Sequence, residues 1–585
     1  MIKSRREFIG NIGTGIVAAT TLSAASASAT AQPSDVNKPQ SGGGTPATQD
    51  RGGQDPVADS EKFDYIVVGG GMAGCAVAAR MSEDPRSRVL LLEAGQENLY
   101  EYSYYSTGAK AMWDGETNWH ISSTPQPNLK GRSIDHPRGR VIGGSAALNI
   151  GSWSRGIAPD YDAWETDGAT GWGWKTALKT FKSIERSARP DGGGRGRKGP
   201  LHLEDTPLAS EMTNVFREAC IAAGFGTTVD HNGAKFDGFD LWETIFPDGR
   251  RRNTAEAYLA SARSRPNLKV ITGALATRVV IEGDRAVGVE YEVAGSRRVS
   301  SSREVLLCAG AFKSPQILML SGIGPAAHLR TNGINVVADV PGVGANLIDH
   351  LCVFLGGTAA SGGIKPVYPD PKEPSQLATW RRTGYGSLAD TEYTSIAFIR
   401  SNPELVYPDI ELIFNVNPPP DMRDDKTKSG FSILVAHVQP KSRGEVRLAS
   451  ADPHAKPLID FRYLSHPDDV RAMTNGFRWA MAMAATPPLA PYGARRNYNP
   501  QASDEAIVEY IRSNAATMYH PVGTARMGAN NDRMAVLDSE LRVRGINGLR
   551  VLDASSMPGI NRGHTMAPTL YIAERGCDLI KGQAA

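Results

Sequence analysis

The chain reads DYIVVGGGMAG at residues 64–74 and VLLLEAG at residues 89–95. An apolar run leads into Gly69-x-Gly71-x-x-Gly74, and a helix-compatible segment follows from Cys75 to Met81. This order predicts a strand, turn, helix, strand unit. Its three glycines allow a tight turn, the approach of a pyrophosphate and close packing of the helix on the strand. The free N–H groups at the helix N-terminus would face the phosphates.

The second apolar run ends on an acid, Glu93. This position lies about 20 residues beyond the last glycine, where a carboxylate accepts hydrogen bonds from ribose hydroxyls. An acid there also repels a 2′-phosphate. The unit therefore predicts FAD or NAD as the cofactor, and not NADP.

Composition narrows the class of protein. At 585 residues the chain should form at least two domains, and 41% hydrophobic with 22% charged residues is typical of a globular enzyme. A net charge of +2 gives no reason to expect nucleic acid or an anionic membrane as a partner. The five cysteines are scattered without a C-x-x-C spacing, so we expect no zinc site, no iron–sulfur cluster and no other metal.

The N-terminal segment has the features of an export signal. SRREFI at residues 4–9 matches a twin-arginine motif, small apolar residues follow, and Ala29-Thr30-Ala31 offers a cleavage site. We therefore predict a twin-arginine signal peptide at residues 1–31 and an exported, periplasmic protein. The segment is too weakly apolar for a membrane anchor, so no integral membrane segment is expected. Residues 32–60 are rich in Pro, Gly, Ser, Asp and Gln and predict a disordered linker.

Several further elements follow from periodicity and from turn residues. Helices are predicted over Trp174–Ser187, over Asn214–Ala223, from Pro315 onward and over about Ala567–Ile580. Strands are predicted over Leu268–Ile271, Val287–Val293, Val299–Cys308 and Leu549–Leu552.

Three blocks carry a family resemblance. They are GRVIGGSAALN at residues 139–149, GAFKSPQILMLSGIG at 310–324 and PGVGANLIDH at 341–350. On these blocks the chain resembles the glucose–methanol–choline (GMC) flavoprotein oxidoreductases, over roughly residues 61–580. The first block departs from the family pattern at Ala146, and the third has Ile348 where Gln is common.

The resemblance implies an α/β fold. A glutathione-reductase-like, Rossmann-type FAD-binding domain would be joined to an α+β substrate domain built on an antiparallel sheet. The FAD-binding domain would comprise residues 61–155, 268–350 and 516–585, and the substrate domain residues 156–267 and 351–515.

The resemblance also implies FAD as the cofactor. Members with covalent flavin have a His at the position of Leu148, so FAD should be bound non-covalently here. The expected cofactor-binding residues are Gly69, Gly71, Met72, Ala73, Gly74, Glu93, Arg140, Gly143, Gly144, Ser145, Asn149, Ile150, Gly151, Ala276, Asp553, Ala554, Thr565 and Met566.

Two histidines match the catalytic pair of the family, His520 in YHPVGTARMG and His564 in NRGHTMAP. His520 would take the hydroxyl proton of an alcohol while hydride passes from carbon to flavin N5, since imidazole has a pKa near working pH. His564 would hold the alcohol oxygen. His350 is interpreted as structural. The implied activity is FAD-dependent oxidation of a small primary alcohol to the aldehyde, with oxygen or quinone as electron acceptor.

The substrate and two alternatives stay open at this point. Trp113, Trp119 and Phe414 suggest an aryl or furanic alcohol, but they can equally be packing residues. One alternative is an FAD-containing lyase or decarboxylase of the same fold, against which the histidine pair argues. The other is a flavoprotein subunit that passes electrons to a haem or quinone partner; no C-x-x-C-H site identifies such a partner.

Overall fold

The structure is a computed structural model that describes residues 57–98, 100–190, 194–206, 211–361, 363–364, 369–370, 372–389, 392–423 and 428–583. The predicted signal segment and most of the predicted linker lie outside this part of the chain. None of the described helices combines the length and the apolarity that a bilayer crossing needs.

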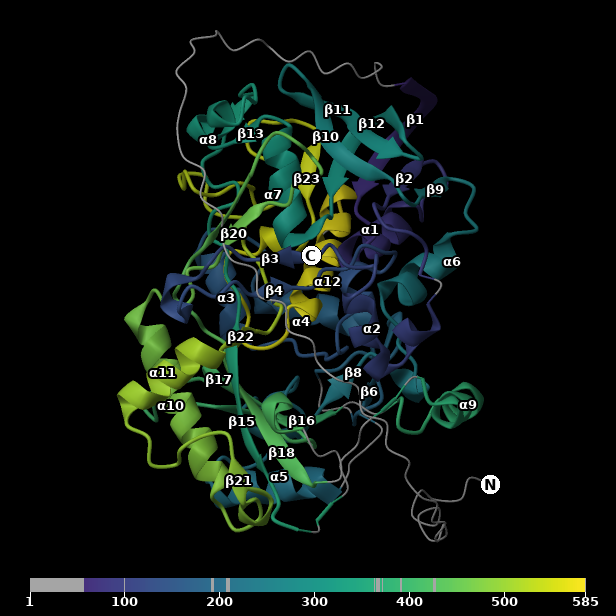
Figure 1. Cartoon of the computed structure of the whole chain (residues 1–585). Helices are drawn as coiled ribbons and strands as arrows, with labels where there is room; N and C mark the ends of the chain where they lie inside the picture. Colours follow the sequence, from purple (N-terminus) through teal and green to yellow (C-terminus); the bar gives the residue numbers. More distant parts are fainter. Residues whose placement is uncertain are drawn as a thin grey trace, which may run out of the picture. The chain divides into compact units, whose positions relative to one another are not determined.

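The first of two large sheets has a parallel centre. Strand β1 lies between β12 and β2 and is parallel to both, while β9 and β23 extend the parallel part and β10 and β11 add an antiparallel edge (Figure 1). Strand β2 is buried at every residue, as expected for a parallel strand covered on both faces. The strands are β1 Val57–Val68, β2 Val89–Leu92, β9 Leu268–Ile271, β10 Leu275–Glu282, β11 Arg285–Val293, β12 Ser296–Leu307 and β23 Leu549–Val551.

Helices α1 and α7 pack on this sheet, and α12 shares its hydrophobic core. Helix α1 follows β1 through the glycine-rich turn and contacts α12, the last helix of the chain. Gly74 lets α1 approach closely, because a Cβ atom there would lie 1.7 Å from the carbonyl oxygen of Gly69. The helices are α1 Met72–Met81, α7 Gly310–Leu320 and α12 Met566–Ile580.

The second large sheet is antiparallel throughout, in the order β21-β15-β18-β17-β16-β7, with β22 also on β15. Helices α5, α10 and α11 share a hydrophobic core with one of its faces (Figure 1). The strands are β7 Gly238–Leu241, β15 Leu351–Thr358, β16 Tyr393–Ile399, β17 Ile410–Asn415, β18 Gly430–His437, β21 Arg495–Arg496 and β22 Ala516–Thr517; the helices are α5 Glu211–Ala222, α10 Pro467–Ala484 and α11 Asp504–Asn514.

Alternation along β15 fixes which face of this sheet meets the functional cavity. Leu351, Val353 and Leu355 enter the core shared with the helices, whereas Cys352 and Phe354 line the cavity. Successive side chains of a strand point to opposite faces, so the sheet has one packed face and one face for the site. A parallel sheet joined to an antiparallel sheet with helices confirms the predicted fold class.

Among the predicted boundaries that were wrong, which include the starts of α5 at Glu211 and β12 at Ser296, three have a cause in the tertiary contacts. Strand β1 begins at Val57, inside the predicted linker, because its first residues pair with β12 and the Tyr291 hydroxyl donates to Asp59 at 2.7 Å. Helix α7 begins at Gly310 and not at Pro315, because Asp553 accepts a hydrogen bond from the Gly310 N–H at 2.8 Å.

The third boundary is the end of helix α4. It spans Trp174–Ile184, and Glu185 then starts a short strand, β5 (Glu185–Ser187), since its carboxylate binds the buried Arg155 and Trp153. Helices α3 (Ala158–Thr166) and α4 contact each other, and α4 contacts α12. Residues 156–267 thus divide between the two cores: α3 and α4 belong to the core of the first sheet, and α5 and β7 to the second.

Candidate active site

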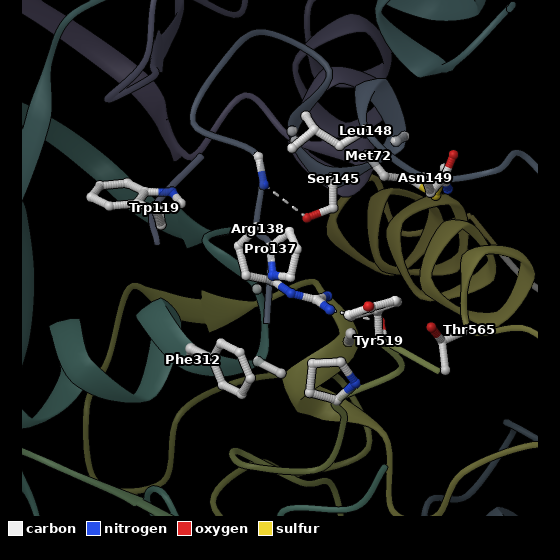
Figure 2. A pocket seen from close by; sticks show the side chains of 18 of the residues that line it. Met72, Trp119, Pro137, Arg138, Ser145, Leu148, Asn149, Phe312, Tyr519 and Thr565 are labelled. Atoms are coloured by element: carbon white, nitrogen blue, oxygen red, sulfur yellow. Dashed lines mark hydrogen bonds between the residues drawn. The ribbon is translucent and has the colours of Figure 1, made fainter. Parts of the chain in front are cut away.

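A cavity of about 510 Å³ lies between the two sheets, and its walls come from segments far apart in the chain. The loop of residues 137–152, the start of α7 and the start of α12 contribute (Figure 2). The face of the second sheet completes the wall. The predicted site residues that line it are Gly69, Gly71, Met72, Ala73, Glu93, Gly144, Ser145, Asn149, Ile150, Gly151, Ala276, His520, Asp553, Ala554, His564, Thr565 and Met566.

Three predicted cofactor residues do not line the cavity. Gly74 contacts the strand, as described above. The N–H of Gly143 donates to the Gly70 carbonyl at 2.8 Å, in a left-handed conformation with φ of 94°. Arg140 is exposed, with its guanidinium 5.0 Å from the centre of the Trp119 ring.

The N-terminus of α1 is shaped for a phosphate-bearing cofactor. No side chain caps this helix, and its first residues line the cavity, so free N–H groups are available to an anion. The glycine-rich turn touches the loop opposite it, since a Cβ atom on Gly144 would lie 2.6 Å from the Gly71 Cα atom. We call these two segments the pyrophosphate cradle; a side chain on Gly144 would push them apart. The residues present fit the pyrophosphate of FAD.

Glu93 stands at the end of β2 and is already bound to the protein. Its carboxylate accepts the N–H groups of Gly70 and Gly95, both at 2.7 Å. Burial raises its pKa to about 7, against the effect of those two hydrogen bonds. Each carboxylate oxygen can accept more than one hydrogen bond, so a ribose can be held as well.

His520 lies in the loop between β22 and β23, and its ring contacts two other imidazoles. Its Nδ1 is 3.0 Å from Nδ1 of His350, and its ring centre is 4.9 Å from that of His564. The Asp349 carboxylate accepts the backbone N–H of His520 at 2.7 Å and fixes the loop. Burial, followed by the charges of His564, His350 and Arg138, holds the pKa of His520 well below its usual value.

His564 precedes α12 and is backed by a carboxylate. Its Nε2 is 2.9 Å from Oε1 of Glu411, the fully buried second residue of β17. The ring of Trp242 packs edge-on against it at 5.3 Å. Since a carboxylate only accepts, Glu411 keeps a proton on Nε2 and leaves the other ring nitrogen for a ligand.

A cation borders the histidines. Arg138 donates to the carbonyl of Tyr519 at 2.9 Å, and burial lowers its pKa to about 10. Figure 2 shows Arg138 between Phe312 and Tyr519, below the bond from the Gly139 N–H to Ser145. Tyr519 has a φ of 62°, a conformation that L-residues rarely adopt and that turns the chain just before His520.

Three further side chains lie beside the predicted site residues and were not among those predicted: His350, Glu411 and Arg138. His350 belongs to the third family block but was interpreted as structural, and the structure places it against His520. Glu411 had a usable signal, since an acid within the apolar run IELIF is unusual in a strand buried at every residue. Arg138 directly precedes the first family block.

One acid and histidine cluster has the spacing of metal ligands. Asp230, His231 and Asp240 lie within 4.8 Å of one another. Arg189 binds Asp240 at 2.6 Å and Arg195 binds Asp230 at 2.9 Å, so the carboxylates are engaged in ion pairs. This cluster is part of a buried salt-bridge network.

Comparisons with known proteins agree with this geometry. GMC oxidoreductase family profiles match residues 63–352 and 440–573. A GMC-type oxidoreductase of Mycobacterium tuberculosis is 41% identical over 534 residues, covering 88% of this chain and 99% of the relative. An oxygen-dependent choline dehydrogenase of Brucella anthropi is 38% identical over 532 residues, covering 89% and 96%.

Solved structures give the same result. Pyridoxine 4-oxidase from Mesorbium loti has a TM-score of 0.81 at 30% identity and covers 89% of this chain and 100% of its own. A fungal aryl-alcohol oxidase has a TM-score of 0.75 at 25% identity, covering 88% and 98%. Family profiles, relatives and fold agree that the chain is an FAD-dependent enzyme, and it belongs to the GMC oxidoreductases.

Proposed function

We propose that this enzyme oxidises a neutral primary alcohol to the aldehyde, with His520 as the base. The observation that supports this most directly is the pair of imidazoles, His520 and His564, whose ring centres lie 4.9 Å apart on the wall of the cofactor cavity. An alcohol oxygen between them could lose its proton to one ring and keep a hydrogen bond to the other.

His350 selects the nitrogen of His520 that acts as base. The two rings meet through their Nδ1 atoms at 3.0 Å, and a hydrogen bond there needs one donor and one acceptor. In the arrangement that we propose, His350 accepts at Nδ1 and His520 donates its Nδ1–H. The lone pair of His520 is then on Nε2 and is free to take the alcohol proton.

The cavity wall next to the histidines favours a neutral substrate. Its side chains are largely apolar, contributed by Cys352, Phe354, Tyr393, Ile413, Leu434 and Met518. The two acids that line the cavity, Glu93 and Asp553, accept backbone N–H groups. Asp349 and Glu411 lie behind the histidines and are bound to them, and the cation Arg138 lies beside His520 on the cavity wall. An aromatic or furanic alcohol fits these walls better than a quaternary ammonium alcohol such as choline.

The cofactor in this proposal is non-covalent FAD, which when bound supplies the acceptor for the substrate hydride. Leu148 lines the cavity and is 3% exposed, and its apolar side chain has no atom that could bond to a flavin. Acid precipitation of the purified protein should leave the flavin in the supernatant. A yellow pellet would contradict non-covalent binding. Oxygen or quinone would reoxidise the flavin, and export would follow the twin-arginine route.

An anaerobic alcohol screen tests the proposed activity. Benzyl alcohol and furfuryl alcohol should bleach the visible flavin band within seconds to minutes, and choline at equal concentration should not. Dithionite serves as the control that the flavin can be reduced. If dithionite bleaches the band and no primary alcohol does, the alcohol oxidase proposal is wrong and the lyase alternative gains support.

A further inference from the structure

Arg251 is a buried cation behind the loop that lines the cofactor cavity. It is 1% exposed, and its guanidinium makes no ion pair with a described carboxylate, although the charge of Glu256 acts on it. Its contacts are instead carbonyl and amide oxygens. Nε donates to the Ser103 carbonyl at 2.8 Å, one terminal nitrogen to the Ala146 carbonyl at 3.0 Å and to Oδ1 of Asn149 at 2.7 Å, and the other to the Asn149 carbonyl at 2.5 Å.

These bonds fix the direction of a peptide group. In a planar trans peptide the carbonyl and the following N–H point in opposite directions, and the described chain has no cis peptide bond. Arg251 holds the Asn149 carbonyl away from the cavity, so the N–H of Ile150 points the other way. Ile150 lines the cavity, and its N–H has no hydrogen-bond partner among the described residues.

The Asn149 side chain reinforces this arrangement. Its Oδ1 accepts from Arg251 and also from the Gly151 N–H at 3.1 Å, while its Nδ2 lies 3.5 Å from the sulfur of Met566. The Arg251 guanidinium therefore links the loop of residues 137–152 to the start of α12 through Asn149. It also binds the segment around Ser103 directly. A lysine could not make these contacts, because it lacks the planar fork of donors.

We propose that Arg251 is a positioning residue for FAD: it turns the Ile150 N–H toward the flavin, and its charge stabilises the negative charge that the flavin gains on reduction. A buried cation with few counter-charges acts strongly on a neighbouring site, because the surrounding dielectric is low. The inference concerns cofactor binding and potential, and it is independent of which substrate the enzyme takes.

The test compares Arg251→Met and Arg251→Lys with Arg252→Met, whose side chain is exposed next along the chain. Three quantities are measured without any alcohol: the FAD dissociation constant, the midpoint potential of bound flavin, and the unfolding temperature of apo and holo protein. Arg251→Met should weaken FAD binding at least tenfold and lower the potential by about 30 mV, the equivalent of tenfold for a two-electron couple.

The other variants separate position from charge. Arg251→Lys keeps the positive charge but loses the planar set of guanidinium donors. The midpoint potential of its bound flavin should therefore stay near that of the wild type, while FAD binding weakens. Arg252→Met should match the wild type in all three measurements. If Arg251→Met binds FAD normally at an unchanged potential and loses apo stability alone, Arg251 has only a structural role and the inference is wrong. If that variant does not fold, an unchanged FAD affinity in Arg251→Lys overturns it.

Discussion

The imidazole of His520 contacts those of His350 and His564, and the proposed chemistry depends on His520. His520→Ala should bind FAD normally and lose flavin reduction by substrate by a factor of about 10² or more, as for removal of a general base. His564→Asn should cost less, because Asn can still hydrogen-bond the alcohol oxygen. The measurement is anaerobic stopped-flow reduction, with the 57% exposed His454→Ala as control. Wild-type reduction in His520→Ala would mean that the proton leaves by another route.

The pKa of His520 sets the pH dependence of the same step. Burial, then His564, His350 and Arg138, lower this pKa well below 6.5. The base acts in its neutral form, so protonation inhibits only when the pH falls below the lowered pKa. The rate of flavin reduction should therefore be level from pH 7.5 to pH 6.5 and fall only well below 6.5. Arg138→Met should shift this acidic limb to higher pH. If the rate of the wild-type enzyme already falls at pH 6.5 or above, His520 is not the base.

Residue by residue, the sequence predicts those parts of the site that lie within a motif. His520, His564 and the loop of residues 143–151 could be identified from local blocks. His350, Glu411 and Arg251 could not be assigned roles, because each acts through a contact made by the tertiary fold: Glu411 meets His564 across 153 residues, and Arg251 meets Asn149 across 102. Their roles depend on which strands and loops become neighbours.

At the scale of elements, the contact between the α1 turn and the cavity loop can be tested at Gly144. A Cβ atom there would lie 2.6 Å from the Gly71 Cα atom, and φ is 54°, so Ala would be strained and would push the two segments apart. Gly144→Ala should weaken FAD binding at least tenfold. Gly131→Ala is the matched control, because its φ is 73° and nothing lies within 4 Å of its Cβ position. That control should cost about 1 kcal/mol of stability and no FAD affinity. Equal FAD affinity in both variants would contradict the proposal that this contact shapes the FAD site.

The sequence predicts whether a segment is a helix or a strand more accurately than it predicts where the segment begins and ends. Periodicity places α12 to within one residue, because a long apolar stripe defines it. It misses the start of α7, where Asp553 from 243 residues away supplies the hydrogen bond that begins the helix. It also misses the start of β1, where pairing with β12 overrides a polar, linker-like composition. Both ends depend on partners distant in the chain.

For the molecule as a whole, the cofactor cavity requires almost the entire described chain. Its lining residues run from Val68 to Thr569, and both sheets contribute. The complete cavity therefore exists only once the two sheets have formed and met. A protein that acquires its cofactor in the cytoplasm must then leave it already folded, and the twin-arginine route carries folded proteins. The predicted signal and the architecture of the cavity are consistent with each other on this point.

This leads to a prediction for export. Replacing Arg5 and Arg6 with Lys should keep the enzyme in the cytoplasm, folded and carrying FAD, because the residues that line the cofactor cavity begin at Val68. Arg51→Lys, in the predicted linker, is the control and should leave export unchanged. Cell fractionation with an immunoblot locates the protein, and flavin fluorescence after gel filtration measures the FAD that it holds. A double-Lys variant found in the periplasm at the wild-type level would show that the chain leaves by another pathway. A cytoplasmic variant without FAD would show that the cofactor is loaded only after export.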